Sequence, residues 1–283
     1  MIRTLDASML NLPYSIRELA PLCAQHGIQA LSATRELLEK KAAAKEAAAV
    51  LKDNGLVWGL MPMPADFYHW DLDEAGFAQA LKTLARHAAA AEKLGVKHAY
   101  NHVWSSGPRA YEENFDWHVR RIAAVSGILA DHGVQYGLEF LGPHELRTWQ
   151  PHEFVHSLPG VLALADAAGG KAGVAFDTFH WYTSTNGCMD DVLFLAQHAD
   201  RLVALHLNDA VAGVPYDKQQ DLQRRLPLET GVIDSREILA CFKAQENDAL
   251  YMIEPFEPSR TRFHAMAAEE AVCTAAEVFR RLE

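Results

Sequence analysis

Residues 174–180 read Val-Ala-Phe-Asp-Thr-Phe-His, an apolar run that ends abruptly in ionisable side chains. A short continuous apolar run is typical of a strand that is buried on both faces, as strands are in a parallel sheet. Asp177 follows the run directly, where an unpaired carboxylate would be costly to bury. The stretch therefore predicts a buried parallel strand that ends in a side chain with a partner or a function.

Three more stretches repeat this design. Residues 136–140 read Tyr-Gly-Leu-Glu-Phe, residues 203–209 read Val-Ala-Leu-His-Leu-Asn-Asp, and residues 251–255 read Tyr-Met-Ile-Glu-Pro. Their ionisable residues at the strand ends are Glu139, His206 and Glu254. With Asp177 these residues are spaced by about 30 to 50 positions, which is room for one helix and a variable loop between successive strands.

Outside these stretches, short β-rich runs continue to alternate with longer helical segments. Such alternation predicts a parallel sheet with crossover helices. The eight expected strands cover residues 3–7, 27–32, 56–62, 98–104, 135–140, 173–177, 201–207 and 249–254. The expected helices include residues 35–53, 73–94, 112–132, 154–168, 189–199, 235–243 and 265–282.

Eight strand and helix units of about 30 residues predict an α/β fold, a (β/α)8 TIM barrel formed by residues 1–283 as a single domain. The alternative is an open doubly wound sheet. In nucleotide-binding folds of that kind a GxGxxG or GxxxxGK[ST] turn follows the first strand, and neither motif is found there. The barrel is the preferred interpretation.

Composition argues against several functional classes. The formal net charge is −11 and the sequence pI is near 5.7, so the chain as a whole repels nucleic-acid phosphates. No apolar run approaches the roughly 20 residues that span a bilayer, and residues 1–6 do not begin a secretory signal. The four cysteines are too scattered for a zinc site or a disulfide framework. We expect a cytoplasmic protein that binds neither nucleic acid nor membrane.

The four ionisable strand ends together indicate a metal site. A single strand-end carboxylate is more often a salt-bridged structural residue, but four such residues on four consecutive strands meet at the end of a barrel where active sites form. Three carboxylates and one imidazole, from Glu139, Asp177, His206 and Glu254, predict one divalent ion. This donor set suits Mn2+, Mg2+ or Co2+ best and also admits Zn2+.

At these residues the chain resembles the xylose isomerase-like TIM barrel superfamily. Within it, the resemblance is to the sugar (phosphate) isomerase/epimerase family, which includes ketose 3-epimerases and inosose isomerases. It extends over nearly the whole chain and is carried by the motifs at 138–140, 176–180, 206–209, 221–227, 231–234 and 253–254.

The resemblance implies a metal-dependent isomerase or epimerase that acts on a small carbohydrate. Glu139 and Glu254 would be catalytic, since the matching glutamates both hold the metal and move a proton next to a carbonyl through an enediolate. His180 and Arg224 match residues that bind substrate oxygens, although the neighbouring Arg225 competes with Arg224 for that assignment.

Four further residues are candidate substrate contacts. Asp209 is expected to orient His206 or to bind substrate through water. His102, Trp104 and Trp181 lie at or beyond strand ends and could offer hydrogen bonds and a ring face, with ordinary packing as the equal alternative.

Departures from the family leave the substrate open. The glutamate that many relatives have at the end of strand two is replaced here by Ser32. A Gly-x-Gly often follows the position of Pro227, where this chain continues Leu-Glu-Thr-Gly. Barrels of this kind often form homo-oligomers, but the sequence does not reveal the oligomeric state.

Three other functions compete. A metal-dependent dehydratase of the inosose or dehydroshikimate type would need nearly the same site. An apurinic endonuclease would need three metals, yet strand three ends in Met-Pro-Met-Pro without histidine, and Asp221-Leu222-Gln223 replaces the expected Asp-x-His. A noncatalytic sugar-binding barrel is disfavoured because both glutamates of the proposed proton transfer are present.

Overall fold

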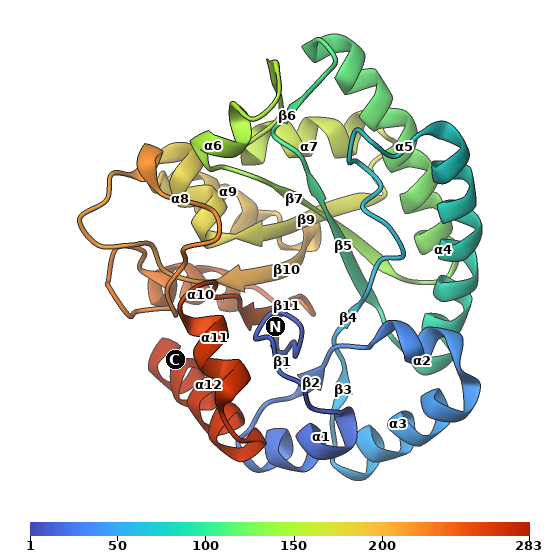
Figure 1. Cartoon of the computed structure of the whole chain (residues 1–283), viewed down its shortest axis with the longest axis vertical. Coiled ribbons are helices and arrows are strands. Elements are labelled where there is room, and N and C mark those ends of the chain that lie inside the picture. The colour runs from blue at the N-terminus through green and yellow to red at the C-terminus, as the bar shows by residue number, and fades with distance from the viewer.

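The expected strands assemble into one parallel sheet at the centre of the molecule, in a computed structural model that describes residues 1–283 (Figure 1). The nine strands of this sheet are β1 (Ile2–Leu5), β2 (Ala30–Leu31), β3 (Val57–Trp58), β4 (Leu60–Met61), β5 (His98–Val103), β7 (Gln135–Phe140), β9 (Ala172–Asp177), β10 (Leu202–Leu207) and β11 (Leu250–Ile253). All eight predicted ranges contain a strand, and the range 56–62 contains both β3 and β4. The (β/α)8 prediction is confirmed.

Helices form a ring outside the sheet (Figure 1). They are α1 (Ile16–Gln25), α2 (Arg35–Glu39), α3 (Lys41–Asp53), α4 (Glu74–Leu94), α5 (Tyr111–Asp131), α6 (His144–Arg147), α7 (Leu158–Ala167), α8 (Thr178–Thr185), α9 (Met189–Gln197), α10 (Ser235–Lys243), α11 (Ser259–Ala265) and α12 (Ala268–Leu282), with short 3-10 turns η1 (Ala199–Arg201) and η2 (Tyr216–Lys218). The helix predicted at 35–53 is divided at Lys40, whose backbone is extended (φ −116°, ψ 101°).

The ring of strands closes through residues 57–61. The sheet order runs β3-β2-β1-β11-β10-β9-β7-β5-β4, so β3 and β4 are the two ends of the sheet, and Gly59 joins them in the chain. A Cβ at Gly59 would lie 2.7 Å from Thr4 Cγ2 and 2.9 Å from Ser32 Oγ, too close for a side chain. Ser32 Oγ also accepts a hydrogen bond from the Leu60 N–H (3.1 Å), so this residue supports the closure.

Alternate strand residues face the barrel interior, where side chains must be small or flexible to fit. Five of these strand residues form a cluster of their own with Met9 from the turn after β1, namely Leu60, Ala175, Ala204, Leu250 and Met252. A larger cluster of 65 buried residues fills the layer between the sheet and the helices. Ala175, Ala204 and Met252 each lie two residues before a predicted metal ligand, so the face that packs the interior also presents those ligands at the strand ends.

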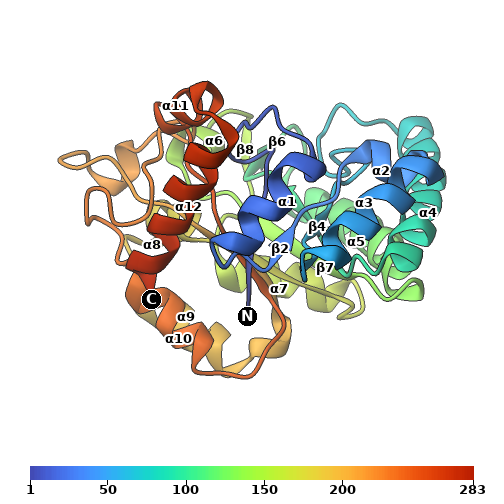
Figure 2. The same ribbon diagram turned by 90° about the horizontal axis from the view of Figure 1, so that it is seen from below.

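The two ends of the barrel carry different elements. Figure 2 shows α6, α11 and the short strands β6 (Ser106–Gly107) and β8 (His152–Glu153) at one end, and the N-terminus toward the other. β6 and β8 form an antiparallel pair that the sequence did not predict. No helix in the chain is both long enough and apolar enough to cross a membrane.

Candidate metal centre

The four predicted ligands converge at the carboxyl ends of the strands. Glu139 comes from β7, Asp177 ends β9, His206 comes from β10 and Glu254 directly follows β11. Each offers one ligand atom, and these atoms all lie within 4.8 Å of one another, with every residue buried. Strand register brings them together, because His206 pairs with Asp177 across the sheet, and the Glu254 N–H bonds to the Leu207 carbonyl oxygen at 2.9 Å.

Asp177 is held by the element that follows it. Its Oδ1 accepts hydrogen bonds from the backbone N–H groups of Phe179 (2.7 Å) and His180 (2.8 Å) and so caps the N-terminus of α8. Its Oδ2 accepts a hydrogen bond from Asn208 Nδ2 (2.8 Å). These contacts fix the carboxylate, and the positive end of the short helix stabilises its charge.

Two histidines flank Glu139. Nδ1 of His206 lies 3.0 Å from Glu139 Oε1 and 3.5 Å from Glu254 Oε2, while Nε2 of His102 lies 3.0 Å from Glu139 Oε2. Burial opposes the charged form of Glu139, but the neighbouring imidazoles outweigh burial and hold the pKa of this carboxyl well below its usual range. Burial likewise opposes protonation of His102, yet the Glu139 charge raises the pKa of His102 to about 9.

Arg224 bridges two of the predicted ligands. Its Nη1 donates to Asp177 Oδ2 (2.9 Å) and to Glu254 Oε2 (3.2 Å). Its Nη2 donates to Asp221 Oδ1 (2.6 Å) and contacts His180 Nε2 (3.0 Å), while its Nε donates to the Asp221 carbonyl oxygen (3.0 Å). The five N–H groups of the guanidinium are thus all directed at protein groups.

The neighbouring arginine has a different environment. Nη1 of Arg225 donates to the Glu257 carbonyl oxygen at the protein surface (2.8 Å), away from the predicted ligands. The sequence left the choice between the two arginines open, and the structure places Arg224 at the centre.

Burial still raises the pKa of Asp177 to about 6, although the charge of Arg224 opposes this shift.

The residues present fit a divalent cation. Three buried carboxylates meet here beside the guanidinium of Arg224 and the imidazoles of His206 and His102. Glu139 Oε2 and His206 Nε2 are buried without a hydrogen-bond partner, and His102 approaches Glu139 Oε2 outside hydrogen-bonding alignment. An oxygen-rich donor set of this kind suits a hard or borderline divalent ion.

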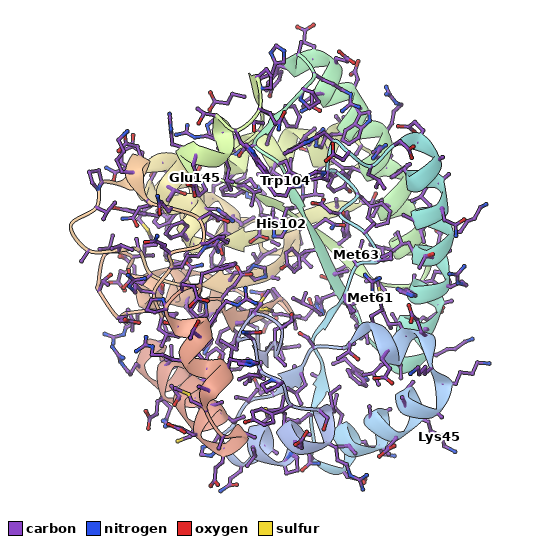
Figure 3. The ribbon with its side chains drawn as sticks, in the orientation of Figure 1. Lys45, Met61, Met63, His102, Trp104 and Glu145 are labelled. Atoms are coloured by element: carbon purple, nitrogen blue, oxygen red, sulfur yellow. The ribbon has the colours of Figure 1, made fainter.

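Two cavities adjoin the centre and share His102. One has a volume of about 410 Å³, and its lining includes His180, Arg224, Glu254 and Trp104. The other has a volume of about 280 Å³ and extends toward Met61 and Met63. In Figure 3, His102 lies between Trp104 and Glu145 on one side and the two methionines on the other. The four predicted residues His102, Trp104, His180 and Arg224 therefore line one cavity beside the centre.

Two other predicted substrate contacts lie apart from these cavities. Both carboxylate oxygens of Asp209 accept backbone N–H groups, from Thr230, Gly231 and Ile233 among others, at 2.8 to 2.9 Å. Its side chain organises that loop and makes no hydrogen bond to His206. Trp181 donates its indole N–H to the Cys188 carbonyl oxygen (3.0 Å), and its ring packs near Phe176. Neither side chain lines the two cavities beside the centre.

Tyr100 is a residue of the centre that the sequence reasoning missed. Its ring centroid lies 4.8 Å from that of His206 and 5.6 Å from that of His102. Burial, followed by the charges of Glu254 and Glu139, raises the pKa of its hydroxyl well above the usual value. The signal was available, because Tyr100 lies two residues before His102 and strand residues at that spacing share a face.

Gly142 is a second residue that the sequence reasoning missed. It contributes no side chain, but it lets two segments of the chain pass close together. A Cβ there would lie 1.9 Å from the His180 carbonyl oxygen and 2.6 Å from Thr183 Oγ1. The chain after β7 therefore passes directly against α8, which brings His180 to the cavity. Only glycine, which has no Cβ, fits at this contact.

The whole-chain comparison agrees with the fold and motifs. A sequence model described as the xylose isomerase-like TIM barrel matches residues 20–282. The chain belongs to the xylose isomerase-like TIM barrel family. No curated protein matches it in sequence.

Solved structures similar to this chain share the barrel. A xylose isomerase domain protein from Alicyclobacillus acidocaldarius superposes with a TM-score of 0.82 at 23% identity, covering 100% of this chain and 98% of that one. The IolI protein with a zinc atom has a TM-score of 0.79 at 18% identity, with 100% and 98% covered. D-psicose 3-epimerase from Clostridium cellulolyticum H10, with D-tagatose, has a TM-score of 0.71 at 14% identity, with 99% and 98% covered.

Proposed function

We propose that the protein is a divalent-metal-dependent isomerase or epimerase that acts on a sugar or a related polyhydroxy ketone. In this proposal a proton is removed from the carbon next to the carbonyl, an enediolate forms, and the proton is returned. The observation that carries the proposal is the convergence of Glu139, Asp177, His206 and Glu254, whose ligand atoms lie within 4.8 Å of one another and which are all buried.

The chain supplies two carboxylates for the proton transfer. Glu139 and Glu254 come from β7 and β11, on either side of β9 and β10, so their carboxylates approach the centre from two directions. One removes the proton and the other returns it. His206 lies between them, 3.0 Å from Glu139 Oε1 and 3.5 Å from Glu254 Oε2, and holds their spacing.

Other residues hold these groups in place. Asp177 and His206 would complete the ligand set with the two glutamates, and a divalent cation held there would supply positive charge for the oxyanion that develops beside the abstracted proton. Arg224 orients Asp177 and Glu254 through the hydrogen bonds of its Nη1. His102, whose side chain is 41% exposed beside a buried Glu139, is the group best placed to meet a substrate oxygen.

The similar structures support the substrate class. D-psicose 3-epimerase and L-ribulose 3-epimerase are among them, and both act on ketose sugars, as their names state. The zinc atom of the IolI protein supports a metal in a barrel of this shape. A soluble ketose or a related carbohydrate is therefore the first substrate class to test, and the cytoplasm is the compartment we propose.

The test is metal-dependent uptake of deuterium from D2O. Protein stripped with a chelator and reloaded with Mn2+, Mg2+, Co2+ or Zn2+ is incubated with ketoses, inososes and hydroxypyruvate, and carbon-bound deuterium is measured by NMR. We expect uptake on at least one compound, a change of sugar identity, and loss of both after chelation.

Two controls make the result specific. Glu254→Gln should abolish uptake, whereas Glu257→Gln, a surface change three residues away, should leave it unchanged. Uptake followed by loss of water, seen as new ultraviolet absorbance of a conjugated enone, would instead identify a dehydratase. Full activity of Glu254→Gln would contradict the proposed proton transfer.

A further inference from the structure

The outer part of the 410 Å³ cavity is apolar. Its polar lining residues are His102, His180, Arg224 and Glu254 near the centre, together with Glu145 and Asp221. The other half of the lining is made of large apolar side chains, namely Trp104, Leu141, Leu146, Trp149, Leu222 and Phe256. A cavity with a polar floor and an apolar wall fits a ligand with two chemically different parts.

Several polar atoms near that wall already have protein partners. The Trp104 indole N–H donates to Asp66 Oδ2 (2.6 Å), and Glu145 Oε1 accepts the Asp221 N–H (2.6 Å). The guanidinium of Arg224 is fully engaged with its own neighbours. Hydroxyl groups packed against the side chains of Trp149, Leu222 and Phe256 would lose water without gaining equivalent hydrogen bonds, which favours an apolar substituent at this part of the wall.

The wall is built as a rigid aromatic surface. Trp70, Trp104 and Trp149 pack edge to face, with ring centroids 5.1 to 5.5 Å apart. The segment that carries Trp149 is tied to β6, because Ser106 Oγ donates to the Leu146 carbonyl oxygen (2.6 Å) and accepts the Gln150 N–H (3.1 Å). Side chains held in this way can contact a flat ligand with little loss of conformational entropy.

Two members of the wall remain largely exposed. Trp149 is 55% exposed and Leu222 is 60% exposed, and they come from separate segments that meet through the contact of Glu145 with Asp221. Exposed large apolar groups that are gathered at the mouth of a cavity mark a surface that a ligand covers. The floor of the same cavity is the proposed metal centre, so one ligand can occupy both.

We propose that the substrate is a ketose-like hydroxyketone that carries an aromatic substituent. The hydroxyketone end lies at the centre beside His102, and the aromatic ring lies against Trp104, Trp149, Leu222 and Phe256. This inference rests on the proposed function, because it assigns the polar end of the ligand to the same centre.

The test compares two ketones that differ by one phenyl group. Binding of 1-hydroxy-4-phenylbutan-2-one and of 1-hydroxybutan-2-one to Mn2+-loaded protein is measured by calorimetry, and deuterium uptake next to their carbonyl is followed by NMR. We expect the phenyl compound to bind about tenfold more tightly or better. Trp149→Ala and Leu222→Ala should each weaken its binding about fivefold or more and leave binding of the other compound unchanged.

A matched variant controls for general effects of surface change. Leu193→Ala removes another exposed leucine, on α9, which lies outside the cavity, and should change neither affinity. Equal affinity for the two ketones, or unchanged phenyl binding in both wall variants, would overturn the inference even if deuterium uptake is intact. Preferential phenyl binding without uptake on any compound would support the aromatic site and count against the proposed function, so the two failures are distinguishable.

Discussion

The carboxylates at the two ends of the barrel have different environments. At the carboxyl end, three buried carboxylates meet around His206 and Arg224. Near the amino end, the side-chain carboxylate of Glu283 is surrounded by Arg3, Lys243 and the hydroxyl of Tyr251. Several carboxylates are buried close together at one end, whereas the Glu283 carboxylate at the other end lies among basic groups near the surface.

This difference distinguishes charged groups that stabilise the fold from charged groups placed for function. Ionisable groups that serve only the fold are paired with opposite charges at the surface, as around Glu283. The carboxyl-end cluster would be unfavourable without compensation, since buried like charges repel and lose hydration. Such an arrangement is expected where a bound cation completes the site, and each variant below tests one end against the other.

The largest effect is expected from a glutamate exchange at each end. Glu139→Gln should lower metal-dependent deuterium uptake by about 10³-fold, because it removes both a ligand charge and a proton acceptor. Glu283→Gln, the same chemical change at the amino end, should leave uptake within about twofold. Steady-state exchange rates on the best ketose measure both. Comparable losses in the two variants would mean that the ends do not differ as described.

The next largest effect is a loss of stability on replacing one of the two adjacent arginines. Arg224→Met should destabilise the metal-free protein by about 3 kcal/mol, because Asp177 and Glu254 lose their shared buried partner. Arg225→Met, which affects a surface contact, should change stability by less than about 0.5 kcal/mol. Urea unfolding after chelation gives both values. Equal stability of the two variants would contradict the bridging role of Arg224.

Metal binding is expected to change the free energy of unfolding by a similar amount. At a metal concentration 100 times the Kd, a cation that binds only the folded chain adds about 2.7 kcal/mol of stability. We expect most of this gain to disappear in Glu254→Gln and to persist in Glu283→Gln. Thermal unfolding with and without Mn2+ measures it. An equal gain in both variants would place the bound metal elsewhere.

The smallest effect concerns pH at the amino end. Burial opposes ionisation of Glu283, but hydrogen bonds from Lys243, Arg3 and Tyr251 outweigh it and lower its pKa to about 2 from the ordinary 4.5. Because the pKa is depressed in the folded state, the stabilisation is fully present above about pH 4.5 and is lost as pH falls through about 2. Glu283→Gln should therefore cost about 0.5 to 1 kcal/mol at pH 7. Urea unfolding at pH 7, 4 and 3 should show this difference shrinking, and a difference independent of pH would refute the ion-pair explanation.

Much of the fold and of the ligand cluster could be predicted, because both depend on short-range periodicity. An apolar run with an ionisable residue after it identifies a strand and its carboxyl end, and all carboxyl ends of a parallel barrel lie on one face. Glu139, Asp177, His206 and Glu254 therefore had to be near one another once the strands were recognised. Tyr100 was accessible to the same reasoning through its spacing from His102.

The loops could not be predicted in this way. The pattern around 221–227 does not say which of two consecutive arginines turns inward, and it does not reveal that the backbone at 230–233 takes both oxygens of Asp209. Trp181 looked like a strand-end ring, but the turn of α8 directs its indole N–H to Cys188. Contacts between segments far apart in the chain decide these orientations.

The sequence by itself determined the alternation of strand and helix, the barrel, and the four ionisable side chains at consecutive strand ends. Local steric and hydrophobic preferences repeat with the period of each element, so these features are readable residue by residue. Only the tertiary structure decided that Arg224 ties Asp177 to Glu254 and that Trp149 and Leu222 meet at one cavity. Those contacts depend on how loops of irregular conformation close over the barrel, and no local period encodes that closure.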